Sequence, residues 1–172
     1  IAALAKALAG HAETSGLAAV LLDAEGPNFS FGASVEEHLP AEAPAMLAGL
    51  HALVLRMAAY PLPIIVAVQG QCLGGGLELA LAGHLIFCAE DARLGQPEIK
   101  LAVFAPAASV LLAARVGRAQ AADILFSGRS LRADEAKAMG LVNEVAGDPG
   151  EAALAYFDKH LAGLSSAALK VA

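Results

Sequence analysis

A run of three glycines followed closely by a glutamate is the feature of the sequence that most suggests chemistry. Gly74, Gly75 and Gly76 come after an apolar stretch, and Glu78 follows on the expected first turn of a helix. Glycine loses more backbone entropy on folding than any other residue, so such a run indicates positive φ angles or a close approach of the backbone to another group. The free N–H groups at a helix N-terminus favour negatively charged oxygen. The pattern predicts an anion-stabilising turn beside a carboxylate.

A second glutamate, Glu98, lies in Gly95-Gln96-Pro97-Glu98, where the proline can begin a helix. Either acid alone could be a first-turn residue that interacts favourably with its helix dipole, and the glycines alone could form a tight turn. Two such acids suggest instead a pair of carboxyl groups serving one site, where one takes a proton from water and the other gives a proton to carbon. We therefore expect Glu78 and Glu98 to face each other across a gap that holds one water molecule.

Other catalytic and metal-binding patterns are missing from the sequence. A dinucleotide-binding G-x-G-x-x-G motif counted from Gly74 and Gly76 would need a glycine where Leu79 stands. No serine has glycine at both positions two residues away, which excludes a nucleophile elbow. We expect no metal site, because the histidines show no metal-ligand spacing.

Apolar runs alternate with helical periodicity along the chain, which is typical of an α/β fold built from βαβ units with a mostly parallel sheet. Strands are expected at residues 17–22, 64–68, 84–89 and 141–145. Helices are expected at residues 1–14, 43–60, 77–82, 106–116, 119–126 and 133–139. We expect a catalytic core over residues 1–146 and the start of a C-terminal helical region over residues 147–172.

The overall composition argues against several kinds of partner. A formal net charge of −6 with no block of Lys or Arg does not fit a nucleic-acid-binding protein. The apolar fraction is 58%, but no run is long enough for a membrane span. The two cysteines form neither a disulfide framework nor a metal-ligand set, so we expect buried free thiols and a cytoplasmic protein.

The motifs resemble those of the enoyl-CoA hydratase/isomerase family, also called the crotonase family. The resemblance rests on Gly70-x-Cys72-Leu73-Gly74-Gly75-Gly76-x-Glu78-Leu79-Ala80, Gly95-Gln96-Pro97-Glu98 and Phe29-Ser30-Phe31-Gly32-Ala33. It implies a crotonase-like fold of repeated ββα and βαβ units. It also implies an acyl-CoA thioester substrate, no cofactor beyond the coenzyme A of that substrate, and a homotrimer or a dimer of trimers.

The resemblance further implies roles for individual residues. In the family, two backbone N–H groups form an oxyanion hole for the thioester oxygen, and these match Ala33 and Gly75. Glu78 and Glu98 match the two acids that handle water. The residues expected to line the substrate site are Phe31, Gly32, Gly74 and Phe104. His38 could also face the pocket, although a lone histidine is more often a surface residue.

Two departures from the family pattern concern the substrate. Ser34 stands where the family usually has aspartate, and residues 101–109 replace a glycine-rich segment. Residues 31–38 and 103–109 are similar to those of family members that hydrate cyclohexa-1,5-diene-1-carbonyl-CoA. We therefore expect hydration of a cyclic dienoyl thioester. The alternatives are a general enoyl-CoA hydratase or isomerase of fatty-acid oxidation and a catalytically inactive binding subunit.

Overall fold

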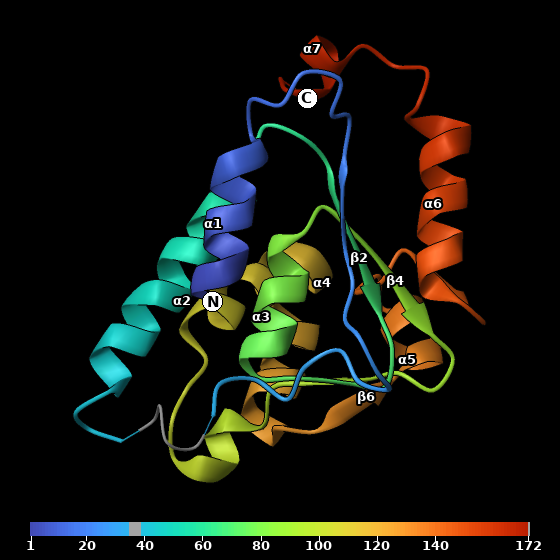
Figure 1. The fold of residues 1–172 in the computed structure, drawn as a ribbon. Coiled ribbons are helices and arrows are strands. Elements are labelled where there is room, and N and C mark those ends of the chain that lie inside the picture. Colours follow the sequence, from blue (N-terminus) through green and yellow to red (C-terminus); the bar gives the residue numbers. More distant parts are fainter. Residues whose placement is uncertain (35–38, 172) are drawn as a thin grey trace.

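The structure is a computed structural model that describes residues 1–34 and 39–171. Its elements form two sheets and the helices that cover them (Figure 1). His38, considered above as a pocket residue, lies outside the described residues. Within the described part of the chain, none of the helices combines the length and the apolar character needed to cross a membrane.

The first sheet has four parallel strands. In spatial order they are β1 (Val20–Leu22), β2 (Ile64–Val68), β4 (Leu85–Ala89) and β7 (Glu144–Ala146). Every residue of β2 is buried, as expected for a parallel strand with both faces covered. The β-branched run predicted to be a strand over residues 64–68 therefore forms one with the same bounds.

The second sheet is smaller and runs across one end of the first (Figure 1). Its strands are β3 (Gln71–Leu73), β5 (Arg93–Gly95) and β6 (Ser130–Arg132), with β3 parallel and β6 antiparallel to β5. Sequence reasoning missed all three, because strands of three residues are too short to show a period. The strand predicted at 141–145 is found slightly later, as β7.

The helices complete a repeating unit. Their bounds are α1 (Ala2–His11), α2 (Ala43–Ala58), α3 (Gly75–Ala82), the 3-10 helix η2 (Pro97–Leu101), α4 (Pro106–Ser127), α5 (Ala133–Ala138), α6 (Pro149–His160) and α7 (Ser166–Leu169). A strand of the first sheet, a strand of the second and a helix follow one another twice, as β2-β3-α3 and as β4-β5-α4 with η2 before the helix. The expected ββα units are thus present.

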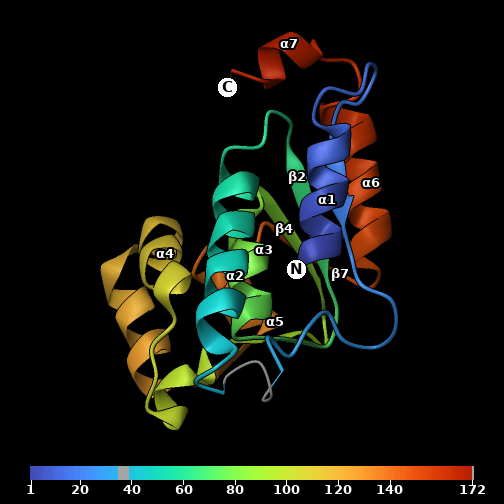
Figure 2. The same ribbon diagram turned by 60° about the vertical axis from the view of Figure 1, so that its left-hand side comes forward.

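Helix α4 contains a break that the sequence analysis placed correctly. Gly117 has φ 78° and ψ 162°, which are not helical angles, so the segments before and after it are two helices in contact end to end. We predicted separate helices over residues 106–116 and 119–126. Figure 2 shows α4 beside α3, on the opposite side of the molecule from α6.

Helices cover both faces of the first sheet (Figure 1). On one face, Val66 and Val68 pack in the main core with residues of α2 and α3 such as Met57. On the other face, Phe87 of β4 packs against α6, where its ring and that of Tyr156 meet edge to face with centroids 5.5 Å apart. Helix α6, within the expected C-terminal helical region of residues 147–172, therefore packs directly on the sheet.

His84 joins the start of β4 to β2 and gives the fold a pH-dependent contact. Its Nδ1 accepts a hydrogen bond of 2.9 Å from the Ile64 N–H, which requires that nitrogen to be unprotonated. Burial, and the charge of the nearby Arg115, lower the pKa of His84. The folded protein therefore binds this proton less readily than the unfolded chain.

We predict that His84 makes stability fall in mild acid. Because the folded pKa lies below the unfolded value of 6.5, the contribution of His84 is fully present above that value and is lost as the pH falls below it. His84→Asn keeps an acceptor at the same place but cannot titrate. In urea unfolding between about pH 7 and 5, the wild-type protein should lose more unfolding free energy than this variant. Parallel pH curves for the two proteins would contradict the prediction.

Candidate active site

The turn between β3 and α3 brings backbone and side chains into unusually close contact. Gly74 has φ 54° and ψ −128°, which glycine adopts far more easily than other residues. A Cβ at this position would lie 2.6 Å from Oε1 of Glu98. Both features expected of the glycine run, a positive φ and a close approach, are therefore found at Gly74. The missing side chain is what allows the Glu98 carboxyl group to lie against the turn.

Glu98 reaches the turn from η2. This 3-10 helix begins at Pro97, as expected from the sequence, and is followed by Ala102, whose φ of 58° is left-handed. The Glu98 carbonyl accepts hydrogen bonds from the N–H groups of Ala102 and Val103. A tight turn therefore fixes the backbone that carries this carboxyl group.

The segment that contains Ala33 lies along the other side of the glycine turn. Ser30 N–H donates to the Gln71 carbonyl and Leu73 N–H donates to the Ser30 carbonyl, each at 2.9 Å. Two residues further on, a Cβ on Gly32 would lie 3.2 Å from the Gly75 nitrogen. Hydrogen bonds to β3 therefore hold this segment against the start of α3.

Ala33 and Gly75 bring their backbone nitrogens into the same small region. A Cβ on Gly75 would lie 3.8 Å from the Ala33 nitrogen. Among the hydrogen bonds between described residues, the N–H groups of Ala33 and Gly75 donate to no backbone or side-chain acceptor. Two unused donors thus lie close together at the N-terminus of α3. That both point at one oxygen stays a prediction.

Glu78 projects from the first turn of α3 but is held by a different helix. Its side chain is 3% exposed, and its Oε1 accepts a hydrogen bond of 2.9 Å from the N–H of Ala108, the third residue of α4. The partial positive charge at the N-terminus of α4 stabilises a buried carboxylate in this position. The sequence placed Glu78 on the first turn of its own helix, but it did not indicate Ala108 as a partner, because an alanine carries no chemical signal.

Gln96 is a second buried polar side chain at the turn. It is 1% exposed, and its Nε2 donates to the Gly74 carbonyl at 3.2 Å. The same carbonyl accepts from the Glu78 N–H at 3.0 Å, and the Gly74 N–H donates to the Gly95 carbonyl at 3.0 Å. Gln96 stands within the Gly95-Gln96-Pro97-Glu98 motif, but no role for it followed from the sequence. Its place directly before Pro97, the expected start of a helix, was the available signal in the sequence.

Phe31 and Phe104, expected to line a substrate pocket, have exposed rings in this chain. The exposed fractions are 66% for Phe31 and 70% for Phe104. The carbonyl of Phe31 nevertheless lies 4.0 Å from the position of a Cβ on Gly74, so its backbone is part of the turn's surroundings. Several other apolar side chains near Phe104 are also exposed, namely Ile99, Leu101 and Val103.

The cysteines and the metal-binding residue types offer no alternative chemistry in the described chain. Cys72, within the glycine motif, and Cys88 are free and buried, as predicted. Burial raises the pKa of the Cys72 thiol far above its usual range and that of Cys88 to about 11, so neither is a ready thiolate nucleophile. No three His, Cys, Asp or Glu side chains among residues 1–34 and 39–171 gather into a group that could hold a metal ion.

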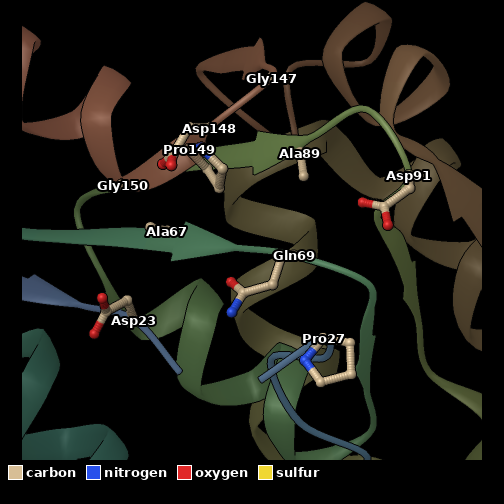
Figure 3. A pocket seen from close by; sticks show the side chains of 10 residues that line it. All are labelled: Asp23, Pro27, Ala67, Gln69, Ala89, Asp91, Gly147, Asp148, Pro149 and Gly150. Atoms are coloured by element: carbon tan, nitrogen blue, oxygen red, sulfur yellow. The ribbon is translucent and has the colours of Figure 1, made fainter. Parts of the chain in front are cut away.

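A cavity in the described part of the chain lies away from the glycine turn. It has a volume of about 420 Å³ and lies at the carboxyl ends of the strands of the first sheet (Figure 3). Asp23, Asp91 and Asp148 line it, and Asp148 also caps α6 by accepting from the Glu151 N–H. Three carboxylates disfavour an anionic ligand there. Because neither Glu78 nor Glu98 lines this cavity, we place the candidate active site at the glycine turn.

Comparisons with known proteins show the family to which the chain belongs. A family model described as enoyl-CoA hydratase/isomerase matches residues 1–164. A cyclohexa-1,5-dienecarbonyl-CoA hydratase of Thauera aromatica is 57% identical over the whole chain, which covers 67% of that protein. A putative enoyl-CoA hydratase of Thermus thermophilus is 41% identical over 80% of this chain and 56% of its own length. The chain thus spans between about half and two thirds of these relatives.

Solved structures of similar proteins have the same arrangement of elements. A crystal structure of an enoyl-CoA hydratase from Thermoplasma volcanium matches with a TM-score of 0.88 and 31% identity, over 98% of this chain and 68% of the other. A structure of an enoyl-CoA hydratase/carnithine racemase from Magnetospirillum magneticum matches with a TM-score of 0.89 and 32% identity, over 98% of this chain and 66% of the other.

We predict that Gly32 is needed for close packing as well as for its φ angle. Gly32 and Gly26 have similar positive φ values, 96° and 85°, but a Cβ on Gly26 would meet nothing within 4 Å. The unfavourable backbone angle should cost each alanine variant about 1–2 kcal/mol of unfolding free energy. Gly32→Ala should cost clearly more, because its Cβ would press on Gly75. Equal costs in urea unfolding would show that the two segments are not in tight contact.

Proposed function

We propose that this chain, which belongs to the enoyl-CoA hydratase/isomerase family and has its crotonase-like fold, forms the catalytic core of a hydratase that adds water to an α,β-unsaturated acyl-CoA thioester. The observation that carries the proposal is the glycine turn. A buried carboxylate, a second carboxyl group and two unused backbone donors lie around Gly74 and the start of α3. Addition of water to a conjugated thioester uses such groups to transfer the protons and to stabilise the enolate oxygen.

In the proposed mechanism, the N–H groups of Ala33 and Gly75 hold the thioester oxygen. The water oxygen bonds to the electrophilic carbon, and electrons move through the conjugated system onto the thioester oxygen. This movement forms an enolate. Donors fixed at the place where the charge develops stabilise the transition state, and each is worth about 3 kcal/mol when probed by mutation in other enzymes. The partial positive charge at the N-terminus of α3 acts in the same direction.

Glu78 and Glu98 divide the proton transfers between them. One carboxylate takes a proton from the attacking water, and the other, protonated beforehand, delivers a proton to the carbon that becomes nucleophilic in the enolate. Glu78 Oε1 already accepts from Ala108, so its Oε2 is the oxygen left to bind water. We assign the two roles to the pair, since the reaction is reversible and each group must return to its first state.

A cyclic dienoyl-CoA is the substrate that we propose. The support is the 57% identity, over the whole chain, to the Thauera aromatica protein named for cyclohexa-1,5-dienecarbonyl-CoA hydration. A general enoyl-CoA hydratase is the second candidate, supported by the names of the less similar relatives. Both candidates use the same glycine turn and the same two acids, so the acyl group alone separates them.

For the complete protein we propose a homotrimer or a dimer of trimers in the cytoplasm. The exposed apolar side chains of residues 99–104, together with Phe126 at the end of α4, support burial of this surface in an assembly. The buried free thiols support a reducing compartment. Light scattering of the full-length protein at micromolar concentration measures the assembly, and a monomer would contradict the first part.

We predict that substrate preference separates the two candidate activities. The full-length protein should hydrate cyclohexa-1,5-diene-1-carbonyl-CoA with a kcat/KM at least about tenfold above that for crotonyl-CoA, since shape differences in a pocket are worth 10–200-fold. The change in absorbance of the conjugated thioester, calibrated for each substrate, measures both reactions. A preference for crotonyl-CoA would favour the general hydratase, and no hydration of either would favour an inactive binding protein.

We also predict that either glutamate is essential for turnover but not for binding. Glu78→Gln and Glu98→Gln keep size and hydrogen bonding, so each should lower kcat by about 10²–10⁴-fold with little change in KM. Glu90→Gln, the same change at an exposed residue after β4, is the matched control and should keep wild-type kcat. A folded Glu78 or Glu98 variant with near wild-type turnover would refute the two-carboxylate mechanism.

A further inference from the structure

Gln96 is a buried polar side chain that the proposed proton transfers do not use. Among the described residues, only Glu78 and Gln96 are buried polar or charged side chains. The Gln96 amide makes one hydrogen bond, from Nε2 to the Gly74 carbonyl at 3.2 Å, while its buried Oε1 has no hydrogen-bond partner. A half-satisfied buried amide is unusual in a folded protein and needs an explanation.

The accepting carbonyl belongs to the same peptide unit as the Gly75 N–H. A trans peptide is planar, so its C=O and N–H point in opposite directions, and fixing one fixes the other. Gly74 and Gly75 flank this unit, and glycine resists rotation of a peptide plane less than any other residue. The Glu78 N–H already donates to the carbonyl at 3.0 Å. A second donor from another direction holds the plane against rotation.

We propose that Gln96 is a positioning residue, whose amide fixes the Gly74–Gly75 peptide plane so that the Gly75 N–H meets the thioester oxygen as negative charge develops on it. The inference rests on the proposed function, because it assigns the Gly75 N–H to the oxyanion. Gln96 itself touches neither the substrate nor the reacting atoms. Its effect passes entirely through the peptide unit.

Stability alone does not account for a glutamine at this position. Methionine has the same unbranched length, carries no amide, and would leave no buried Oε1 unpaired. The Gly74 carbonyl would still accept from the Glu78 N–H, so the substitution would leave no new buried group unsatisfied. A role in packing predicts a loss of stability in Gln96→Met, whereas a role in positioning predicts a loss of turnover without one.

The first test compares Gln96→Met with Gln69→Met in the full-length protein. Gln69 also donates through Nε2 to backbone carbonyls, those of Ala24 and Gly26 at 2.6 and 3.2 Å, but it lies at the carboxyl end of β2 and lines the other cavity. Gln96→Met should unfold at the same or a higher urea concentration than the wild type. Its kcat should fall at least about tenfold, but less than the 10²–10³-fold cost of removing an oxyanion donor, with KM little changed. Gln69→Met should keep wild-type kcat.

The second test observes the thioester carbonyl directly. Cyclohexanecarbonyl-CoA has no double bond to hydrate, so its ¹³C-labelled carbonyl can be followed by infrared spectroscopy while bound. Donors aimed at the oxygen should shift the carbonyl stretch to lower wavenumber in the wild type, and the shift should be smaller in Gln96→Met. If the methionine variant does not fold, Gln96→Leu also removes the amide donor without adding a charge or a new polar group, so the same reduced shift and kcat are expected.

Wild-type kcat with a wild-type carbonyl shift in a folded Gln96 variant would overturn the positioning role and leave the proposed hydratase intact. A lower kcat with an unchanged shift would overturn it too, since the loss would then not pass through the oxyanion donor. If the wild-type protein hydrates no enoyl thioester and does not shift the carbonyl, the proposed function fails, and the role of Gln96 fails with it.

Discussion

The space beside the Gly74 Cα decides how the candidate site is built. The Glu98 carboxyl group occupies it, so a Cβ at position 74 would lie 2.6 Å from Glu98 Oε1. The same residue donates to Gly95 and accepts from Gln96 and Glu78. One glycine therefore joins β3, β5, η2 and α3, and every group proposed to act on the substrate is positioned relative to it. No other residue type could take both its φ angle and its place.

The crossing of the two sheets supplies the rigid frame for this turn. The first sheet is closed on both faces by apolar side chains, whereas β3 and β5 of the second sheet lead directly into the turns that carry Glu78 and Glu98. The proposed reacting carboxyl groups thus lie on helices that follow strands of the second sheet, whereas the buried strands β2 and β4 of the first sheet contribute stability. The division explains why the buried polar side chains, Glu78 and Gln96, both follow strands of the second sheet.

A buried carboxylate and a half-satisfied amide are both unfavourable for folding, and the two residues that carry them, Glu78 and Gln96, both donate to the Gly74 carbonyl. The N-terminus of α4 offsets part of the free-energy cost of burying Glu78, because the Ala108 N–H donates a hydrogen bond to this carboxylate. The Ala108 N–H would otherwise lack an acceptor. Helix and carboxylate therefore satisfy one another, and each fixes the other's position. Residues 101–109 replace the family's glycine-rich segment, and this hydrogen bond links them to Glu78 through Ala108.

The sequence by itself determined the features that depend on neighbouring residues. The β-branched run of β2, the glycine turn into α3, the start of η2 at Pro97 and the break at Gly117 were all predictable, because each follows from local backbone preferences. Family motifs added the candidate acids and donors. Only the tertiary structure decided the three short strands of the second sheet, the bond from Ala108 to Glu78 and the burial of Gln96. These features depend on contacts between residues far apart in the chain, and no local pattern encodes such contacts.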